Sequence, residues 1–213
     1  MIYILLGPPG AGKGTQGVRI AEAFGIPAIS TGGIFRDMAA AGTPLGLQAK
    51  SYFSQGKLVP DEIVIGLVKE RIGLDDCKNG FLLDGFPRTI AQADALEKIM
   101  AELGLKLDGA LDFSVSDEEL IRRLSGRRTC QSCGATYHIE FMPPKKIDIC
   151  DNCGGSLIQR ADDAPESIKT RLTEYKNKTA PLISYYKERG LLKTVAADAS
   201  PDEIYQRVLK IIS

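Results

Sequence analysis

The sequence contains no tryptophan, a single histidine and no excess of either charge, because 27 lysines and arginines balance 27 aspartates and glutamates. A chain without net positive charge lacks the overall attraction that nucleic-acid-binding proteins exert on phosphate backbones. Any basic site must therefore be local, and we expect no nucleic-acid partner.

Long apolar runs are also missing. No stretch approaches the roughly 18 to 20 apolar residues that a membrane-spanning helix needs. The apolar residues at the N-terminus stop at Gly7 and follow no basic segment, unlike a secretory signal peptide. We therefore expect no membrane partner and a cytoplasmic location.

The residues that are present have the proportions of a folded protein. Hydrophobic residues make up 44% of the 213 residues and charged residues 25%, both close to the average of globular proteins. This length corresponds to one domain, or to one domain that carries insertions.

Cysteine is scarce but grouped, since four of the five cysteines form two close pairs. The pairs are Cys130-x2-Cys133 and Cys150-x2-Cys153, and each is followed directly by a glycine. This spacing is typical of a tetrahedral zinc site, in which four thiolates leave no position open for a catalytic water. We therefore expect a structural metal in a segment too small to bury a core of its own. Iron in place of zinc, or two disulfides, are the alternatives.

Short apolar runs alternate with segments of helical periodicity along most of the chain. We predict strands at residues 2–6, 80–84, 109–115 and 191–196, and helices at residues 13–24, 92–103 and 203–212. Strands that are apolar on successive residues and separated by helices indicate right-handed βαβ crossovers. The predicted fold class is α/β, with a doubly wound parallel sheet covered by helices on both faces.

Two stretches interrupt this alternation. Residues 30–60 are mostly helical and punctuated by glycines, whereas residues 127–163 hold the four paired cysteines and show little helical periodicity. Both are predicted to be insertions in the core. Ligands of such sheets bind beyond the carboxyl ends of the strands.

A phosphate-binding loop is predicted between the first strand and the first helix. Residues 7–13 read GPPGAGK and satisfy G-x-x-x-x-G-K in the strand–loop–helix context that this pattern requires. Backbone N–H groups of the loop, the positive end of the helix and Lys13 would surround a polyphosphate. Gly14 stands where the general pattern has Ser or Thr, so the hydroxyl that commonly binds magnesium is absent or moved to Thr15.

A dinucleotide-binding loop is the nearest rival for this segment. Residues 12–17 match G-x-G-x-x-G, and Asp37 follows about twenty residues later. The first glycine of that match lies six residues beyond the predicted strand, which favours the phosphate loop.

Five segments, in order along the whole chain, resemble the motifs of the adenylate kinase family in its long-lid bacterial form. They are residues 7–15 (GPPGAGKGT), residues 30–32 (STG) with Arg36, residues 84–88 (DGFPR), residues 126–128 (GRR), and residues 160–163 (RADD) with Arg171.

The resemblance implies the domains and the reaction. It implies a five-stranded phosphate-loop core of residues 1–29, 60–126 and 164–213, an AMP-binding domain of residues 30–59 and a zinc-binding lid of residues 127–163. The implied enzyme is a monomer that reversibly transfers a phosphoryl group from MgATP to AMP, giving two ADP. Its lid would close over the substrates and exclude water.

The resemblance also implies roles for individual residues. The ATP-binding residues are Gly10, Ala11, Gly12, Lys13, Gly14, Thr15, Arg123, Arg127, Thr136, Tyr137 and Ala199. The AMP-binding residues are Thr31, Arg36, Lys57, Leu58, Val59, Gly85, Phe86, Pro87, Arg88, Gln92, Arg160 and Arg171. The catalytic residues are Lys13, Arg88, Arg127, Arg160, Arg171 and Asp84, with Asp84 orienting the water shell of magnesium.

The chemistry of phosphoryl transfer supports this interpretation independently. The reaction needs two phosphates held in line and positive groups that compensate the charge on the transferring group. The planar fork of arginine binds phosphate oxygens bidentately, so arginines from separate segments are expected to converge. The alternative for each arginine is a surface ion pair.

Four positions carry secondary predictions. By resemblance, Asp162 and Asp163 pair with arginines and hinge the lid, and they are also expected to cap a helix that starts near Pro165. His138 is expected to be a packing or surface residue rather than a base. Gly33 departs from the family pattern, which usually has an aspartate there, so one carboxylate near the magnesium water network is missing.

Two other functions compete with this one. A kinase that phosphorylates UMP, CMP or GMP would use the same phosphate groups. A nucleotide switch would need only the loop, but residues 84–88 have no purpose in a switch, and the guanine-reading pattern N-K-x-D fails at residues 177–180.

Overall fold

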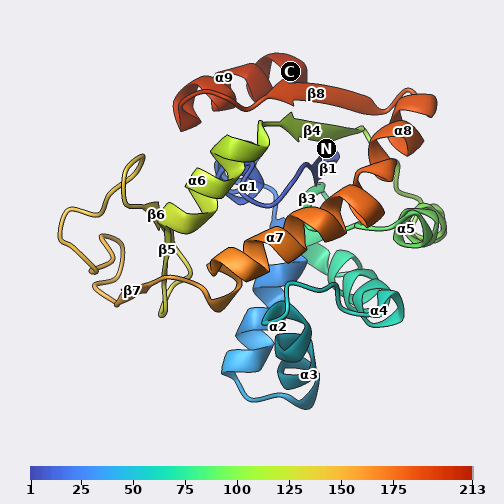
Figure 1. Cartoon of the computed structure of the whole chain (residues 1–213). Helices are drawn as coiled ribbons and strands as arrows, with labels where there is room; N and C mark the ends of the chain where they lie inside the picture. Colours follow the sequence, from blue (N-terminus) through green and yellow to red (C-terminus); the bar gives the residue numbers. More distant parts are fainter. Residues whose placement is uncertain (213) are drawn as a thin grey trace.

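The computed structural model describes residues 1–212 (Figure 1). Five parallel strands form the central sheet in the order β2-β3-β1-β4-β8. They are β1 Ile2–Leu6, β2 Ala28–Ser30, β3 Phe81–Asp84, β4 Gly109–Ser114 and β8 Leu192–Ala196. The predicted doubly wound parallel sheet is confirmed. The apolar pattern did not reveal β2, because this short edge strand has one fully buried side chain, Ile29.

Apolar side chains on successive residues of β1 bury both faces of the sheet. Ile2, Ile4 and Leu6 belong to one core, whereas Tyr3 and Leu5 belong to the other. The first core is covered by α4 Asp61–Ile72, α5 Ile90–Glu102 and α8 Pro181–Glu188. The second is covered by α1 Lys13–Phe24, α6 Asp117–Gly126, α7 Pro165–Glu174 and α9 Pro201–Ile212.

The predicted helices exist, and two of them begin earlier than expected. The predicted helix 92–103 begins at Ile90, because the Thr89 hydroxyl accepts a hydrogen bond from the Gln92 N–H and caps the first turn. The predicted helix 203–212 begins at Pro201, which suits the first position of a helix.

The first insertion, residues 30–59, is helical as predicted, and we call it the helical insertion. It contains α2 Thr31–Ala40 and α3 Pro44–Phe53, which pack against each other. Each helix starts at a side-chain cap: Ser30 accepts from the Gly33 N–H, and Thr43 accepts from the Gly46 N–H.

The second insertion, residues 127–163, is a small antiparallel sheet that stands away from the central sheet beside α6 (Figure 1), and we call it the cysteine insertion. Its strands are β5 Arg127–Cys130, β6 Thr136–His138 and β7 Leu157–Ile158, in the order β6-β5-β7. Its own buried core consists of Cys130, Tyr137, Cys150 and Leu157. So small a core explains why a metal is expected here.

The chain returns to the core through α7, a π-helical turn at Tyr175–Thr179 and α8. The prediction that Asp162 and Asp163 cap α7 is wrong. Its cap residue is Ala164, no side chain accepts a hydrogen bond there, and Pro165 occupies the first turn. No helix within residues 1–212 has the length and apolarity to cross a membrane.

Two glycine-to-alanine substitutions test the packing of the helical insertion. A β-carbon on Gly46 would lie 2.2 Å from the Met38 carbonyl carbon of α2, whereas nothing lies within 4 Å of a β-carbon on Gly66, an exposed residue of α4. Gly46→Ala should lower the free energy of unfolding by about 1–3 kcal/mol, and Gly66→Ala should raise it by roughly 0.5–1 kcal/mol. Urea unfolding of both variants would check this, and equal effects would contradict the close contact of α2 with α3.

Candidate active site

The loop between β1 and α1 presents the positive end of a helix. Gly7, Gly10 and Gly12 have φ angles of 132°, 89° and 90°, which side-chain-bearing residues rarely adopt. A β-carbon on Gly7 would also lie 2.8 Å from the Phe113 carbonyl oxygen. No side chain caps α1, and no acidic residue lies in its first turn. Its first N–H groups are therefore available to an anion.

Lys13 folds back over this loop. Its Nζ donates to the Gly7 carbonyl at 2.8 Å and to the Pro8 carbonyl at 2.9 Å. The pKa of Lys13 is lowered to about 8, chiefly by burial; Asp84 opposes this shift, and the nearby arginines add to it. The ammonium group therefore lies beside the loop in an environment that destabilises its positive charge. Phosphate oxygens would stabilise that charge.

Asp84 ends β3 directly beside the start of α1. A β-carbon on Gly14 would lie 3.4 Å from Asp84 Oδ2. Because glycine has no side chain, the carboxylate can lie close to the helix at this position. A carboxylate in this place suits the oxygen-ligand chemistry of magnesium and its bound waters. The residues present therefore fit a MgATP site, although Gly14 offers no hydroxyl ligand.

One cleft of about 1380 Å³ extends from the phosphate loop to both insertions. Ordinary small-molecule pockets have roughly 300–1,000 Å³, so this cleft is large enough for more than one nucleotide. The cationic residues that line it are Lys13, Arg36, Arg88, Arg123, Arg127, Arg160 and Arg171. Folding thus brings these positive side chains together. Arg123 pairs with Glu119 of its own helix, with Nε donating to the carboxylate at 2.7 Å.

Asp163 is completely buried and holds two of these arginines. The Nε of Arg127 donates to one of its carboxylate oxygens at 2.8 Å, and Nη1 of Arg171 donates to the other at 3.0 Å. Asp162 adds a second contact at 3.1 Å from the Arg171 guanidinium. The acidic pair therefore joins the start of the cysteine insertion to core helix α7.

The remaining arginines are less fully compensated. Burial lowers the pKa of Arg36, Arg88 and Arg160, for Arg160 to about 9, and neighbouring guanidinium groups add to the effect. Burial would raise the pKa of Asp162, but Arg171 and the other arginines outweigh it, so that this pKa lies below its usual value. The cleft is thus a region of strong positive potential in a chain of zero net charge.

A smaller pocket of about 20 Å³ lies between the helical insertion and the loop that follows β3. Its polar lining comes from Thr31, Gly85, Arg88 and Gln92. The Gly85 carbonyl accepts from the Thr31 hydroxyl at 2.9 Å and from Arg88 Nε at 2.8 Å. This network ties the start of α2 to the loop that follows β3.

Some residues with predicted roles do not line either pocket. They are Ala11, Lys57, Phe86, Asp162 and Asp163. Ala11 and Phe86 have no exposed surface, and the Lys57 ammonium donates to Gln55 on the exterior. Tyr137 lines the cleft, but its hydroxyl accepts from the Asp151 N–H at 2.8 Å inside the cysteine insertion.

The remaining predicted residues do border a pocket. In the large cleft these are Gly10, Gly12, Gly14, Thr15, Pro87, Thr136 and Ala199, with Leu58 bordering both pockets and Val59 only the small one.

Sequence analysis missed several side chains that hold the site together. Thr129 accepts from Arg160 Nε at 2.8 Å, and the Thr179 hydroxyl donates to the Arg88 carbonyl at 2.9 Å. Asp61 accepts from Gln92 Nε2 at 2.7 Å. These residues lie in no motif and are far along the chain from their partners, so no local signal could have identified them.

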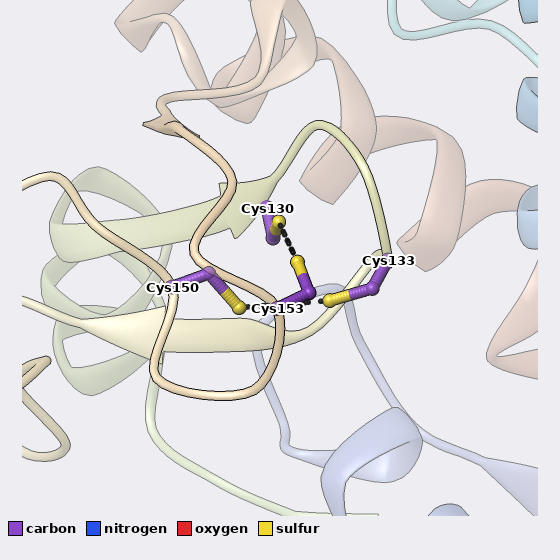
Figure 2. Close-up of side chains that lie close together, drawn as sticks. All are labelled: Cys130, Cys133, Cys150 and Cys153. Atoms are coloured by element: carbon purple, nitrogen blue, oxygen red, sulfur yellow. Dashed lines mark hydrogen bonds between the residues drawn. The ribbon is translucent and has the colours of Figure 1, made fainter.

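The four paired cysteines point toward one another (Figure 2). Their sulfur atoms all lie within 4.8 Å of one another, with Cys130–Cys153 and Cys133–Cys150 separations of 3.5 Å. A tetrahedral zinc with Zn–S bonds of about 2.3 Å places its sulfurs roughly 3.8 Å apart. The cysteines are free thiols, and 3.5 Å is far longer than the disulfide bond length of about 2.05 Å. The four sulfurs therefore fit a structural zinc ion, and the disulfide alternative is wrong.

The two cysteine pairs form matching turns. Gly134 and Gly154 both have φ of 73°, and each donates its N–H to the carbonyl of the first cysteine of its pair. Glycine is needed here because other residues rarely adopt this φ.

His138 is a packing residue, as expected. It is buried, it stacks on Phe141 with ring centroids 4.4 Å apart, and its Nδ1 accepts from the backbone N–H groups of Glu140 and Phe141. A β-carbon on Gly126 would lie 2.2 Å from the ring, so the histidine fills the joint between α6 and the cysteine insertion.

Comparisons with known proteins point to one family. A family model described as adenylate kinase matches residues 5–191. An adenylate kinase of Caldicellulosiruptor saccharolyticus is 55% identical over 212 residues, covering 100% of this chain and 99% of the relative. One of Carboxydothermus hydrogenoformans is 54% identical, with 98% and 97% covered. One of Archaeoglobus fulgidus is 49% identical, with 100% and 98% covered.

Removal of the metal tests the role of the cysteines. The unmodified protein and Cys77→Ala should each contain one zinc per chain by elemental analysis, whereas Cys133→Ala should contain none, because Cys77 lies outside the cluster. Chelation should lower the melting temperature by roughly 5 °C or more, since about 1 kcal/mol corresponds to 2–4 °C at this chain length. Turnover at 25 °C should persist, because no position of the metal is open to substrate. Turnover that disappeared with an intact fold would contradict a structural role.

Proposed function

The chain belongs to the adenylate kinase family and catalyses phosphoryl transfer from ATP to AMP, and we propose that the cationic cleft between the two insertions is where the transfer takes place. The observation that carries this proposal is the convergence of seven positive side chains on one cleft. Two nucleotides whose phosphates meet in the cleft would place the largest negative charge where the positive charge is concentrated.

The phosphate loop and Lys13 are proposed to hold the transferred phosphate and the leaving diphosphate of ATP. The uncapped end of α1 supports this role, as do the carbonyl contacts that keep the Lys13 ammonium beside the loop. A magnesium ion bound with ATP would neutralise part of the charge on the phosphates. Asp84 is the carboxylate positioned to orient the waters of that ion.

Arg36 and Arg88 are proposed to bind the AMP phosphate. Both line the cleft on the side of the helical insertion, and Arg88 is fixed by its bond to the Gly85 carbonyl. The attacking atom is already a charged phosphate oxygen, so no side chain needs to remove a proton from it. Catalysis then consists of alignment and charge compensation, the two terms that dominate phosphoryl transfer.

Arg127, Arg160 and Arg171 are proposed to surround the group in transfer. Asp163 supports this assignment, because it fixes Arg127 and Arg171 while leaving part of each guanidinium free. Fixed donors stabilise a transition state without reorganising during the reaction.

The two insertions are proposed to be mobile domains that enclose the substrates. The helical insertion is then the AMP-binding domain, and the cysteine insertion is a lid over ATP. A pocket of about 20 Å³ has room for about one water molecule and not for a purine, which supports a movement of the helical insertion. Closure would keep water away from the transferring phosphate. A cytoplasmic location is part of the proposal, supported by the free thiols.

An assay of nucleotide products tests the proposed site. ATP plus AMP should give ADP, and GMP, CMP or UMP should replace AMP poorly. Arg88→Ala should lower kcat/KM by about 10²–10³-fold, since it removes one donor to a charged group. Arg189→Ala removes an exposed arginine outside the cleft and should leave the rate unchanged. An active Arg88→Ala variant would contradict the assignment of the phosphate site.

The pKa of Lys13 predicts the pH dependence of ATP capture. The lysine is charged below its pKa of about 8 and neutral above it, so kcat/KM for MgATP should fall as pH rises through 8. The substrate phosphates do not titrate there, because their second pKa is about 6. Because this pKa is lowered in the folded state, the buried charge costs stability below pH 8, and that cost fades as pH rises toward 10.5. A kcat/KM that stayed constant to pH 9.5, measured with stability in parallel, would contradict this role.

A further inference from the structure

Asp61 makes two hydrogen bonds across the boundary between α4 and α5. It is the first residue of α4. Its Oδ1 accepts from Gln92 Nε2 at 2.7 Å, and its Oδ2 accepts from the Thr89 hydroxyl at 2.8 Å. Asp61 itself lines neither pocket. Its contribution to the site must therefore pass through the residues that it holds.

Gln92 is held at both ends of its amide. The Gln92 side chain is buried, with 1% of its surface exposed, and its Oε1 accepts from the Arg88 backbone N–H at 2.7 Å. A carboxylate can only accept hydrogen bonds, and a backbone N–H can only donate them. The partners themselves thus fix which end of the amide is nitrogen and which is oxygen. Turning the amide over would oppose oxygen to oxygen and N–H to N–H, both in a buried place.

We propose that Asp61 is a positioning residue that sets the base specificity of the small pocket by fixing the orientation of the Gln92 amide. This inference rests on the proposed function, in which that pocket receives the base of the monophosphate. Gln92 lines the pocket together with Thr31, Gly85 and Arg88. After its two protein contacts, the amide retains one N–H donor and one acceptor lone pair.

This remaining donor and acceptor match a 6-aminopurine. Adenine presents an amino donor next to a ring-nitrogen acceptor, and glutamine can bind that pair with both amide atoms. Hypoxanthine has the same size, but it presents a carbonyl oxygen in place of the amino group. Its oxygen would face the fixed Gln92 Oε1. The amide could serve hypoxanthine only by turning over, which Asp61 and the Arg88 N–H oppose together.

Asp61 also supports the start of α5, where Gln92 lies. The Thr89 hydroxyl donates to Asp61 and accepts from the Gln92 backbone N–H at 3.1 Å. Because the hydroxyl donates its hydrogen bond to the carboxylate, its oxygen is free to accept from the helix N–H as a cap. The same carboxylate therefore orients both the backbone and the side chain at position 92.

The experiment measures kcat/KM for AMP and for inosine monophosphate at saturating MgATP. Inosine monophosphate differs from AMP in the polarity of this one edge. Asp61→Ala should lower the ratio of kcat/KM for AMP to that for inosine monophosphate by about tenfold. It removes one of the two hydrogen bonds that fix the orientation of the Gln92 amide. Asp61→Asn keeps the shape but can present either its oxygen or its NH2 group to Gln92, so it should lower the ratio about as much as Asp61→Ala does.

Glu62→Ala is the matched control. Glu62 is the second carboxylate in the first turn of α4, and it is exposed. Like Asp61→Ala, Glu62→Ala removes a negative charge that interacts favourably with the positive N-terminal end of α4, but it does not change the contacts of Gln92. The ratio should therefore stay at the unmodified value. Melting temperatures of all variants separate a loss of fold from a loss of selectivity.

A double-mutant cycle with Gln92→Ala shows whether Asp61 acts through Gln92. Gln92→Ala should itself lower the ratio, and Asp61→Ala should add nothing to it in that background. An unchanged ratio in Asp61→Ala, or an equal effect with and without Gln92, would overturn the positioning role while leaving the proposed function intact. If the unmodified protein made no ADP from ATP and AMP, the proposed function would fail, and this inference with it.

Discussion

The cleft depends on a buried carboxylate that two arginines share. Arg127 begins the cysteine insertion and Arg171 belongs to core helix α7, yet both donate to the fully buried Asp163. Without a shared partner, two guanidinium groups this close would repel each other, and each buried charge would be costly. The shared contact therefore fixes where the insertion leaves the core. The carboxylates do not compensate Arg36, Arg88 and Arg160 to the same degree, so the folded protein retains positive charge that phosphates would balance.

The two insertions are stabilised in different ways. The helical insertion contributes Phe35 and Ala49 to the main hydrophobic core, so it is continuous with the body of the protein. The cysteine insertion has a separate core of four residues and four convergent thiolates. A metal-bound unit of this kind keeps its own shape whatever its orientation. It contacts the body through Asp163, through His138 over Gly126, and through the ion pair of Arg122 in α6 with Glu140.

Much of the fold could be predicted from the sequence, because its main signals are local. Successive apolar residues in β1 require burial on both faces, and the GPPGAGK run requires a loop between a strand and a helix. The spacing of the cysteines likewise predicts their cluster. The edge strand β2 escaped prediction because it is held by pairing with β3 rather than by its own pattern. The cap predicted at Asp162 and Asp163 failed, because their carboxylates pair with arginines, as the resemblance implied, and Ala164 occupies the cap position.

Residues that bind phosphates can be identified from the sequence more readily than residues that recognise a base. Phosphates are bound by charge, and any cation that reaches the cleft contributes, so short motifs suffice to identify the residues. A base is recognised by the order of donor and acceptor along one edge. In the proposed base pocket, that order would depend on the orientation of the Gln92 amide, which contacts a carboxylate 31 residues away and a backbone N–H. A glutamine at position 92 is by itself compatible with either purine polarity, so a selectivity at this position would have to come from the tertiary structure around it.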